Sequence, residues 1–458
     1  MVAGRIYFRS CLPDGLTTVK HSNTHHPLLQ WQTGNPVEHF VQWRARHPDG
    51  NALLVVDFLF EQYWLADTPP LALTALYCLG SDCGLCVSVT DKALHNTHSD
   101  PVEQYAAWAK ALGFAVIVMG DALALTPQYI AKPWGQEIWF TGVEERGVCC
   151  IGEGEGETPI PWLQAVVPGA VYGAPGLPLV LLKILDPLNQ PVIGDLYFEL
   201  HEEKREVYVV THIDPGAWPE GTGYIRFGFA PEQLALHGDD GSFRAAYLAA
   251  VRNYERVRRA LDAQISSGEN PSQEVLDSEE QLRREMDMFT HMRPLQLGDV
   301  VKVPLLTPHS LQHGVRTIEF QTPVYERKIM SFAQRVLTQD HWDTEEAVAQ
   351  MTLTQPTPEQ FERLQQSPGL LVERIVDFDD FEVQRVCLAD GRALDALNIE
   401  DYALVIVVDG QLRVADRVYG SEQALLLPRD WEGSLESAEP AAALVFLLAR
   451  PRNTAVES

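Results

Sequence analysis

Long apolar runs, an excess of basic residues and a secretory leader pattern are all missing from this sequence of 458 residues. The longest apolar run, Ala441 to Ala449, is far shorter than the roughly 18 residues that a membrane-spanning helix needs. The 63 acidic residues outnumber the 35 Lys and Arg, for a formal net charge of −28, which disfavours both nucleic acid and an anionic membrane as partners. The N-terminus has no basic segment followed by an apolar one. We therefore expect a cytoplasmic protein with no nucleic-acid and no membrane partner.

Cysteine is scarce as well, and its seven copies do not form the even, closely spaced set of a secreted disulfide framework. Cys78, Cys83 and Cys86 have a C-x4-C-x2-C spacing that overlaps a plant-type iron–sulfur loop. Their flanks are apolar and strand-like, and a fourth ligand would lie far downstream, so we interpret them as ordinary buried residues. The histidines of the segment His21 to His26 lack acidic or cysteine companions, which indicates a polar loop.

The length of the chain predicts more than one domain, and the pattern changes near residue 125. Before it, strands alternate with a helix, which predicts a small α/β or α+β module without a catalytic pattern. After it, short strands separated by Gly and Pro predict β-barrels. A segment with helical spacing, broken at Ser266 to Pro271, interrupts them. We predict an N-terminal module (1–125), a metal-binding barrel (126–240 with 293–345), a helical insert (241–292) and a metal-free C-terminal barrel (346–458).

Two segments carry residue types that commonly bind metals, at a spacing that would let them meet. Glu199 and His201 are two apart, so on a strand they point to the same face, and a short turn brings Glu206 back on the next strand. His309 follows about a hundred residues later, after Gly298 and the strand that leads to Pro304. Carboxylates and imidazoles suit Zn²⁺, with Mn²⁺ or Fe²⁺ as alternatives, and leave room for substrate or water.

Together these segments resemble the two signature motifs of the cupin superfamily, and more narrowly those of the type I mannose-6-phosphate isomerases. In that family a Gln-x-His pair, a Glu and a later His hold zinc. The resemblance covers about 129–451 and implies a mainly β fold: two cupin-type β-barrels with an inserted helical hairpin, after the N-terminal module. It also implies the metal ligands Glu199, His201, Glu206 and His309.

The family pattern also implies catalytic residues. It places a Lys two positions before the Glu ligand, an acidic residue in the strand after the last His, and then an Arg. These positions hold Lys204, Glu319 and Arg327. The chain departs from the pattern where Glu199 replaces the Gln, and where only two residues separate His201 from Lys204. A Ser-Asp pair that commonly precedes the Arg is also missing.

The chemistry implied is interconversion of an aldose and a ketose, with a sugar or a sugar phosphate as the small-molecule partner. Glu319 is the expected base, because a proton must move between two carbons through an enediol. Arg327 and Lys204 would stabilise an oxyanion or hold a phosphate. Alternatively, Glu319 and Arg327 form a structural ion pair, and Lys204 lies in a solvated turn. The alternative functions are an Fe²⁺-dependent cupin oxygenase and a sugar-binding or regulatory protein without turnover.

Overall fold

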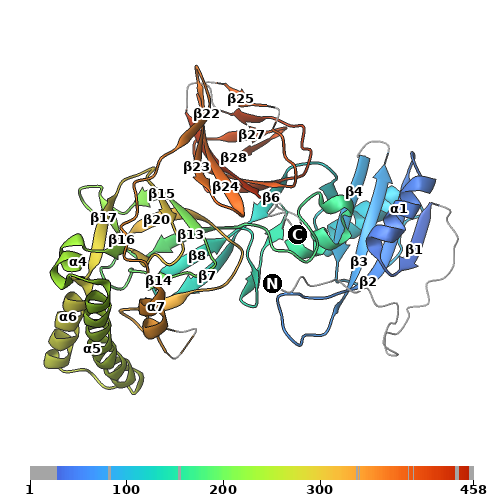
Figure 1. Ribbon diagram of the computed structural model, residues 1–458. Coiled ribbons are helices and arrows are strands. Elements are labelled where there is room, and N and C mark those ends of the chain that lie inside the picture. Colours follow the sequence, from blue (N-terminus) through green and yellow to red (C-terminus); the bar gives the residue numbers. More distant parts are fainter. Residues whose placement is uncertain are drawn as a thin grey trace. The chain divides into compact units, whose positions relative to one another are not determined.

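A computed structural model describes residues 28–452 of the chain, apart from 81–83, 153–155, 337–338, 340, 390, 396 and 439–442. The chain forms two compact units. Unit 1 comprises residues 1–128, 140–180 and 362–458, and unit 2 comprises residues 129–139 and 181–361. Strands dominate both units (Figure 1), which confirms the predicted mainly β fold. The boundaries of the four parts expected from the sequence stay a prediction.

Unit 1 begins with a five-stranded sheet of order β1-β2-β3-β4-β5, in which β1 and β2 are parallel and the other pairs antiparallel. Its elements are β1 (Leu29–Thr33), α1 (Pro36–Arg46), β2 (Ala52–Phe60), β3 (Leu71–Gly80), β4 (Gly84–Thr90), α2 (Pro101–Leu112) and β5 (Ile117–Val118). Helix α2 begins after Asp100, which caps its first N–H groups, and ends at Gly113, which has φ +68°. Strand β5 is short, and just before it the Ala115 N–H donates to Thr158 Oγ1.

The cysteines of the N-terminal sheet agree with their interpretation as core residues. Cys78 and Cys86 lie opposite each other on β3 and β4, and both are buried. Cys83 lies outside the described residues, as do His21, His25 and His26.

The rest of unit 1 contains a sandwich of two antiparallel sheets, of order β12-β11-β6-β29-β26-β31-β24-β23-β22 and β25-β30-β27-β28. Before the C-terminal part of the chain come β6 (Leu123–Thr126), β11 (Cys150–Ile151), β12 (Thr158–Pro159) and α3 (Ile160–Val166), whereas β9 (Val143–Glu144) and β10 (Gly147–Val148) pair with each other in a separate two-stranded sheet. From the C-terminal part come β22 (Glu362–Ser367), β23 (Leu370–Asp377), β24 (Phe381–Leu388), β25 (Ala393–Leu394), β26 (Ala403–Asp409), β27 (Leu412–Val414), β28 (Arg417–Tyr419), β29 (Ala424–Leu427), β30 (Leu435–Ser437) and β31 (Leu444–Pro451). Because β6 pairs with β29, the middle of the chain is part of this sheet.

Unit 2 is a second antiparallel sandwich, with sheets of order β18-β15-β20-β13-β8-β7 and β17-β16-β19-β14-β21. The strands are β7 (Gln128–Lys132), β8 (Gly135–Trp139), β13 (Leu181–Pro187), β14 (Phe198–Leu200), β15 (Glu206–Ile213), β16 (Gly223–Phe229), β17 (Thr290–Leu295), β18 (Val300–Val303), β19 (His309–Leu311), β20 (Val315–Gln321) and β21 (Lys328–Ser331). Trp134, Tyr208 and Phe227 belong to the core between these sheets. The pairings among the described residues leave both sandwiches open at their edges, so the expected barrels take the form of facing sheets.

Helices of unit 2 form the predicted insert between β16 and β17. They are α4 (Pro231–His237), α5 (Asp240–Ser266) and α6 (Gln273–Asp287), and α7 (Thr344–Gln350) follows β21. Figure 1 shows α5 and α6 side by side as a hairpin. The apolar face of α5, which includes Phe243, Tyr247 and Tyr254, is buried against α7 and the outer face of β14 and β16. Among the described residues, no helix is long and apolar enough to cross a membrane.

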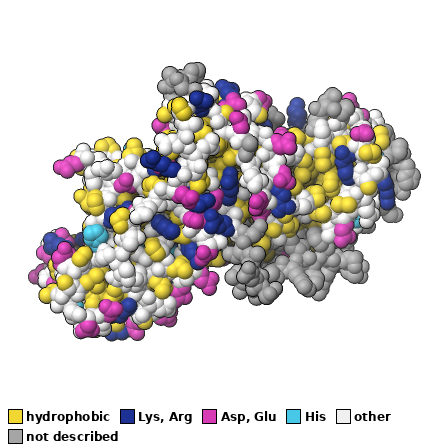
Figure 2. Space-filling view, turned by 45° about the horizontal axis from the view of Figure 1, so that its top comes forward, with side chains coloured by type: hydrophobic (Ala, Val, Ile, Leu, Met, Phe, Trp, Pro, Cys, Tyr) yellow, Lys and Arg dark blue, Asp and Glu magenta, His cyan; other side chains and the backbone are white. Residues whose placement is uncertain are grey.

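Charged side chains of both signs occupy the surface. Figure 2 shows Lys and Arg interspersed with Asp and Glu on the visible face. Cross-strand ion pairs are one form of this mixing: Arg385 lies 2.9 Å from Glu373, and Arg374 lies 3.1 Å from Glu382. Pairs of this kind place opposite charges on adjacent strands, which stabilises the sheet modestly.

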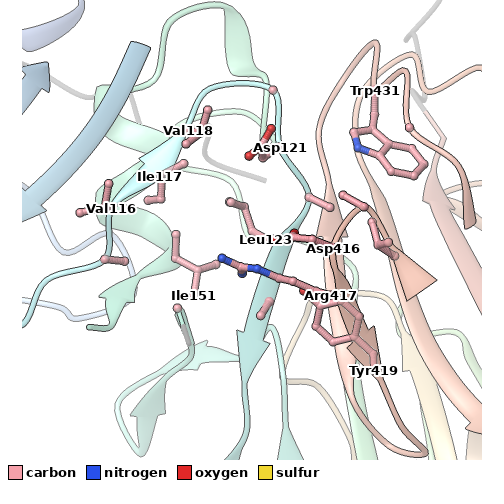
Figure 3. Close-up of a pocket in the computed structure, with 18 of the residues that line it drawn as sticks. Val116, Ile117, Val118, Asp121, Leu123, Ile151, Asp416, Arg417, Tyr419 and Trp431 are labelled. Atoms are coloured by element: carbon pink, nitrogen blue, oxygen red, sulfur yellow. The ribbon is translucent and has the colours of Figure 1, made fainter. Parts of the chain in front are cut away.

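A cleft of about 1140 Å³ opens within unit 1. Its walls come from α2, β5, β6 and the hairpin between β27 and β28. Figure 3 shows Arg417 reaching from this hairpin toward Ile151, with Asp121 and Trp431 at the rim. Most of its polar lining residues, Asp121 and Arg417 among them, are exposed.

Two tyrosines on α5 predict opposite effects of losing a hydroxyl. Tyr254 donates to Glu279 Oε1 at 2.8 Å, whereas the buried Tyr247 hydroxyl has no hydrogen-bond partner among the described residues. We expect Tyr254→Phe to lower the free energy of unfolding by about 1–3 kcal/mol, because the buried Glu279 loses a donor, and Tyr247→Phe to change it by less than about 0.5 kcal/mol. Urea denaturation followed by fluorescence measures both; equal losses would contradict the assignment.

Candidate metal centre

The strand pairing of unit 2 brings Glu199, His201 and His309 together. Glu199 lies in β14 directly opposite His309, the first residue of β19, and His201 follows β14 at once. Because side chains alternate along a strand, Glu199 and His201 project to one face. Glu206 starts β15 in the other sheet. The two sheets therefore present these four side chains to each other across the sandwich.

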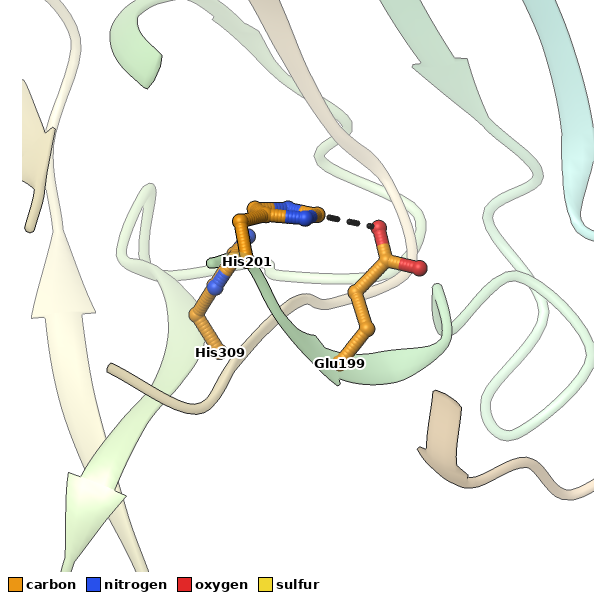
Figure 4. Close-up of side chains that lie close together, drawn as sticks. All are labelled: Glu199, His201 and His309. Atoms are coloured by element: carbon orange, nitrogen blue, oxygen red, sulfur yellow. Dashed lines mark ion pairs between the residues drawn. The ribbon is translucent and has the colours of Figure 1, made fainter. Parts of the chain in front are cut away.

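Three of the four form a group with the dimensions of a metal site. One ligand atom each from Glu199, His201 and His309 lies within 4.8 Å of the others. Figure 4 shows the three side chains pointing toward one another, with His201 Nε2 3.9 Å from Glu199 Oε1. Both histidines are buried. Water is therefore largely excluded from this group.

Backbone carbonyls determine which nitrogen of each imidazole is protonated. His201 Nδ1 lies 3.0 Å from the Glu326 oxygen, and His309 Nδ1 lies 3.0 Å from the Thr307 oxygen. A carbonyl oxygen can only accept, so each Nδ1 carries a proton and each Nε2 faces the site. Such second contacts are typical of histidines that bind metals.

The electrostatics of the group favour a cation between these atoms. Burial lowers the pKa of His201, and Lys204 lowers it further, so this imidazole is neutral with a bare Nε2 lone pair. The His201 Nε2 atom lies 3.4 Å from Glu206 Oε1. His201 Nε2 and Glu199 Oε2 are both buried and make no hydrogen bond in the described part of the chain. A divalent ion would satisfy these acceptors, so the residues present fit a metal.

Glu206 contacts both imidazoles but has other partners as well. Its Oε1 accepts from Lys204 Nζ at 2.7 Å, and its Oε2 accepts from the Tyr208 hydroxyl at 2.6 Å and faces His309 Nε2 at 3.1 Å. Burial opposes its ionisation, but Lys204 holds the pKa of Glu206 well below its usual range. Glu206 is thus an ionised fourth donor beside the group of three. The alternative of a solvated turn is wrong for Lys204, which is buried.

Glu319 lies on the same inner face of the sheet. Register places it opposite Tyr208 of β15 on one side and opposite Lys183 of β13 on the other. Lys183 Nζ is 3.2 Å from Glu319 Oε2. Burial raises the pKa of Glu319 well above its usual value, and Glu206 adds to this, although Lys183 opposes it. A carboxyl group with a raised pKa is suited to proton transfer.

A chain of buried charges continues from Lys183 across β8 to β7. Glu137 Oε1 lies 3.7 Å from Lys183 Nζ, and Glu137 Oε2 lies 3.0 Å from Lys132 Nζ. Trp139 Nε1 donates to the same Oε2 at 2.7 Å. Burial opposes ionisation of Glu137, yet Lys183 and Lys132 lower its pKa to about 2. The charges of this row therefore neutralise one another within the sandwich.

Arg327 lies near the metal group. Its guanidinium is 3.8 Å from Glu199 Oε2 and 4.6 Å from the centre of the Tyr197 ring. Burial opposes ionisation of Glu199, but Arg327 lowers its pKa. Glu199 is therefore anionic.

Sequence reasoning missed Lys183, Glu137, Lys132 and Tyr208. Lys183 had a usable signal, because it is the charged residue inside the otherwise apolar run from Leu177 to Leu185. A lysine buried in such a strand needs an anionic partner. Glu137 and Lys132 flank a tryptophan-rich segment that packing alone could explain. Tyr208 looked like any other strand residue.

Comparison with known proteins connects this geometry to one fold. No protein-family model and no curated protein matches the sequence. Solved structures do match. A mannose 6-phosphate isomerase from Bacillus subtilis has a TM-score of 0.51 and 14% identity over 72% of this chain and 99% of its own. The apo form from Salmonella typhimurium gives 0.52 and 14% over 73% and 100%.

The chain has the fold of the mannose 6-phosphate isomerases. A third match, to a mannose 6-phosphate isomerase bound with zinc and yttrium, has a TM-score of 0.50 and 14% identity, and covers 72% of this chain and 99% of that one. The cupin-type fold expected from the sequence is confirmed. At these identities the likeness concerns the fold alone.

The metal group predicts binding of one divalent ion per chain. We expect a metal-free preparation to take up about one Zn²⁺, and both His201→Ala and His309→Ala to lose it, because each removes an imidazole donor. The exposed His212 on β15 offers a matched control, and His212→Ala should bind like the wild type. Elemental analysis after dialysis measures the content. Retained zinc in both site variants would contradict the assignment.

The buried pair Lys183–Glu319 predicts a coupling between two substitutions. Lys183→Met leaves Glu137 and Glu319 without their shared cation, so we expect a loss of about 3–5 kcal/mol in stability. Adding Glu319→Gln should recover part of this loss, since it removes the carboxylate that Lys183 faced at 3.2 Å, whereas Glu137 keeps Lys132 as a partner. Thermal denaturation of the single and double variants measures the coupling. Strictly additive effects would show that the two side chains do not interact.

Proposed function

We propose that the protein is a metal-dependent aldose–ketose isomerase that acts on a sugar or a sugar phosphate. The observation that carries this proposal is that a metal group and a carboxyl group of raised pKa face the interior of one sandwich, with Glu206, which contacts the metal group, on the strand next to that of Glu319. Glu206 and Tyr208 of β15 lie opposite Gln321 and Glu319 of β20. An isomerisation of this kind needs both an electrophile and a base within one dry site. The fold of the mannose 6-phosphate isomerases supports it.

The reaction moves one proton between two adjacent carbons and another between their oxygens, with no net oxidation. A bound divalent ion would polarise the carbonyl oxygen. Glu199, His201 and His309, with Glu206 beside them, would hold that ion. Zn²⁺ is our proposal, supported by the mixed imidazole and carboxylate donors and by the zinc in a structure of the same fold.

Glu319 is the proposed base. Its raised pKa makes its carboxylate a stronger base than that of an ordinary glutamate. Lys183 donates to the carboxylate at 3.2 Å and stabilises its ionised form when the proton leaves. Glu319 would take the proton from one carbon of the substrate and return it to the next.

Arg327 and Lys204 are the proposed anion-binding residues. Arg327 is about a quarter exposed in its side chain and sits against Glu199, so its guanidinium can meet a substrate oxygen beside the metal group. Lys204 is tied to Glu206 at 2.7 Å. Either cation would stabilise negative charge that develops on the substrate oxygens, or would contact a phosphate.

Proton exchange tests this mechanism more sharply than turnover does. Incubation of aldoses, ketoses and their 6-phosphates in ²H₂O should label the carbon next to the carbonyl, and NMR follows that label. We expect Glu319→Gln to lower the exchange rate by about 10²–10⁴-fold, because the amide cannot accept the proton. The same variant should keep its metal, since Glu319 is not among the ligand residues.

Three results would contradict the proposal. Undiminished exchange in Glu319→Gln would remove the base, and an Fe²⁺-loaded chain that consumes oxygen with these substrates would favour oxygenase chemistry. Sugar binding without any exchange in the zinc-loaded wild type would favour a binding protein.

A further inference from the structure

The turn that follows His201 is very short and is held from outside. Only Glu202 and Glu203 separate His201 from Lys204, so the turn has no core of its own. Both backbone N–H groups of this pair donate to Glu326 Oε2, at 2.9 Å from Glu202 and 3.2 Å from Glu203. One carboxylate oxygen on another segment therefore closes the turn.

The same residue also holds the imidazole. His201 Nδ1 donates to the backbone oxygen of Glu326 at 3.0 Å. Glu326 thus reaches a candidate ligand by two routes: its main chain fixes the tautomer of the ring, and its side chain fixes the turn into which the ring's own strand runs. The two sets of contacts lie within three consecutive residues, 201–203, so motion of the turn would displace the ring.

The two residues after Glu326 also contact the segment that contains Glu199, His201 and the turn. Arg327 lies 3.8 Å from Glu199 Oε2, and Lys328 Nζ lies 3.5 Å from Glu202 Oε1. The register of β14 with β21 sets Leu200 opposite Lys328. Three consecutive side chains therefore contact the segment that bears two candidate ligands. Among them, Glu326 contacts the backbone of the turn.

We propose that Glu326 is a positioning residue of the metal centre, acting through the Glu202–Glu203 turn and the ring of His201. The inference rests on the metal site of the proposed function and extends it to a residue that touches neither metal nor substrate. The two N–H groups share one acceptor oxygen, so the geometry of these hydrogen bonds fixes the turn. Their removal would leave two donors to be solvated and would let His201 leave the geometry that ligation requires.

Two conservative variants separate geometry from charge. Glu326→Gln loses the charge but keeps an acceptor oxygen at the same reach, so we expect zinc affinity within about 3-fold of the wild type. Glu326→Asp keeps the charge but withdraws the acceptor by one methylene, and Glu326→Ala removes it. For both we expect affinity about 10–100-fold lower and faster release of zinc to a chelator, the range typical of groups that orient metal ligands.

Glu203→Ala is the matched control. It removes a carboxylate from the same turn, but the Glu203 side chain is exposed and its backbone N–H remains. Zinc affinity is measured by competition with a chromophoric chelator, and the visible absorption of Co²⁺-loaded protein reports the ligand geometry. Melting temperatures of the metal-free forms identify any variant that does not fold. If Glu326→Ala does not fold, the zinc affinities of Glu326→Gln and Glu326→Asp test the inference.

The outcomes are distinct. Normal zinc affinity in both Glu326→Asp and Glu326→Ala would overturn the inference and leave the metal site intact. A Gln variant as weak as the Ala variant would also overturn it, because charge rather than the hydrogen bonds would then be responsible. A wild-type chain that binds no zinc would overturn the inference together with the proposed function. Loss of proton exchange in Glu319→Gln is independent of all three.

Discussion

Neutralisation of charge inside a dry sandwich is the constraint on which unit 2 depends. Lys132, Glu137, Lys183 and Glu319 form a row of alternating charge across four neighbouring strands, and each side chain lies within 4 Å of the next. Burying any one of these charges alone would cost much free energy. In the row, each charged side chain has a neighbour of opposite charge as its partner. In the metal group this neutralisation is incomplete, because the anionic Glu199 and Glu206 face histidine nitrogens that carry no positive charge to balance them. A divalent cation completes it.

The pairing of strands converts this constraint into a site. Antiparallel register sets Glu199 against His309, and sets Tyr208, Glu319 and Lys183 side by side across three strands. A shift of one residue in any of these pairs would turn its side chains to the opposite face. The helices of the insert pack on the outer side of β14 and β16 and leave the inner face to the polar residues. Unit 1 uses the same two-sheet design with an apolar interior.

The helices, the strands and the candidate metal ligands could be predicted from the sequence, because local residue patterns indicate local structure. Helix α2 has apolar residues at helical spacing, and the structure adds a capping Asp and a terminal Gly at its ends. The insert has one apolar face and one clear break. The proposed ligands stand two apart on a strand or in a segment that resembles a known motif. Lys132, Glu137 and Tyr208 escaped, because nothing local to each residue says which strand will lie beside it. Glu326 escaped for the same reason: the turn that it closes is more than a hundred residues earlier in the chain.

The sequence by itself determined the β-rich fold, the helical insert and the residue types that could bind a metal, since these follow from periodicity, turn chemistry and donor atoms. Tertiary structure decided which donors meet, which nitrogen of each histidine faces the site, and why the pKa of Glu319 is raised while that of Glu206 is lowered. Those properties depend on burial and on charges brought close by long-range strand pairing. Two glutamates of the same sequence thus acquire opposite acid–base character: Lys204 outweighs the burial of Glu206, whereas the burial of Glu319, reinforced by Glu206, outweighs Lys183.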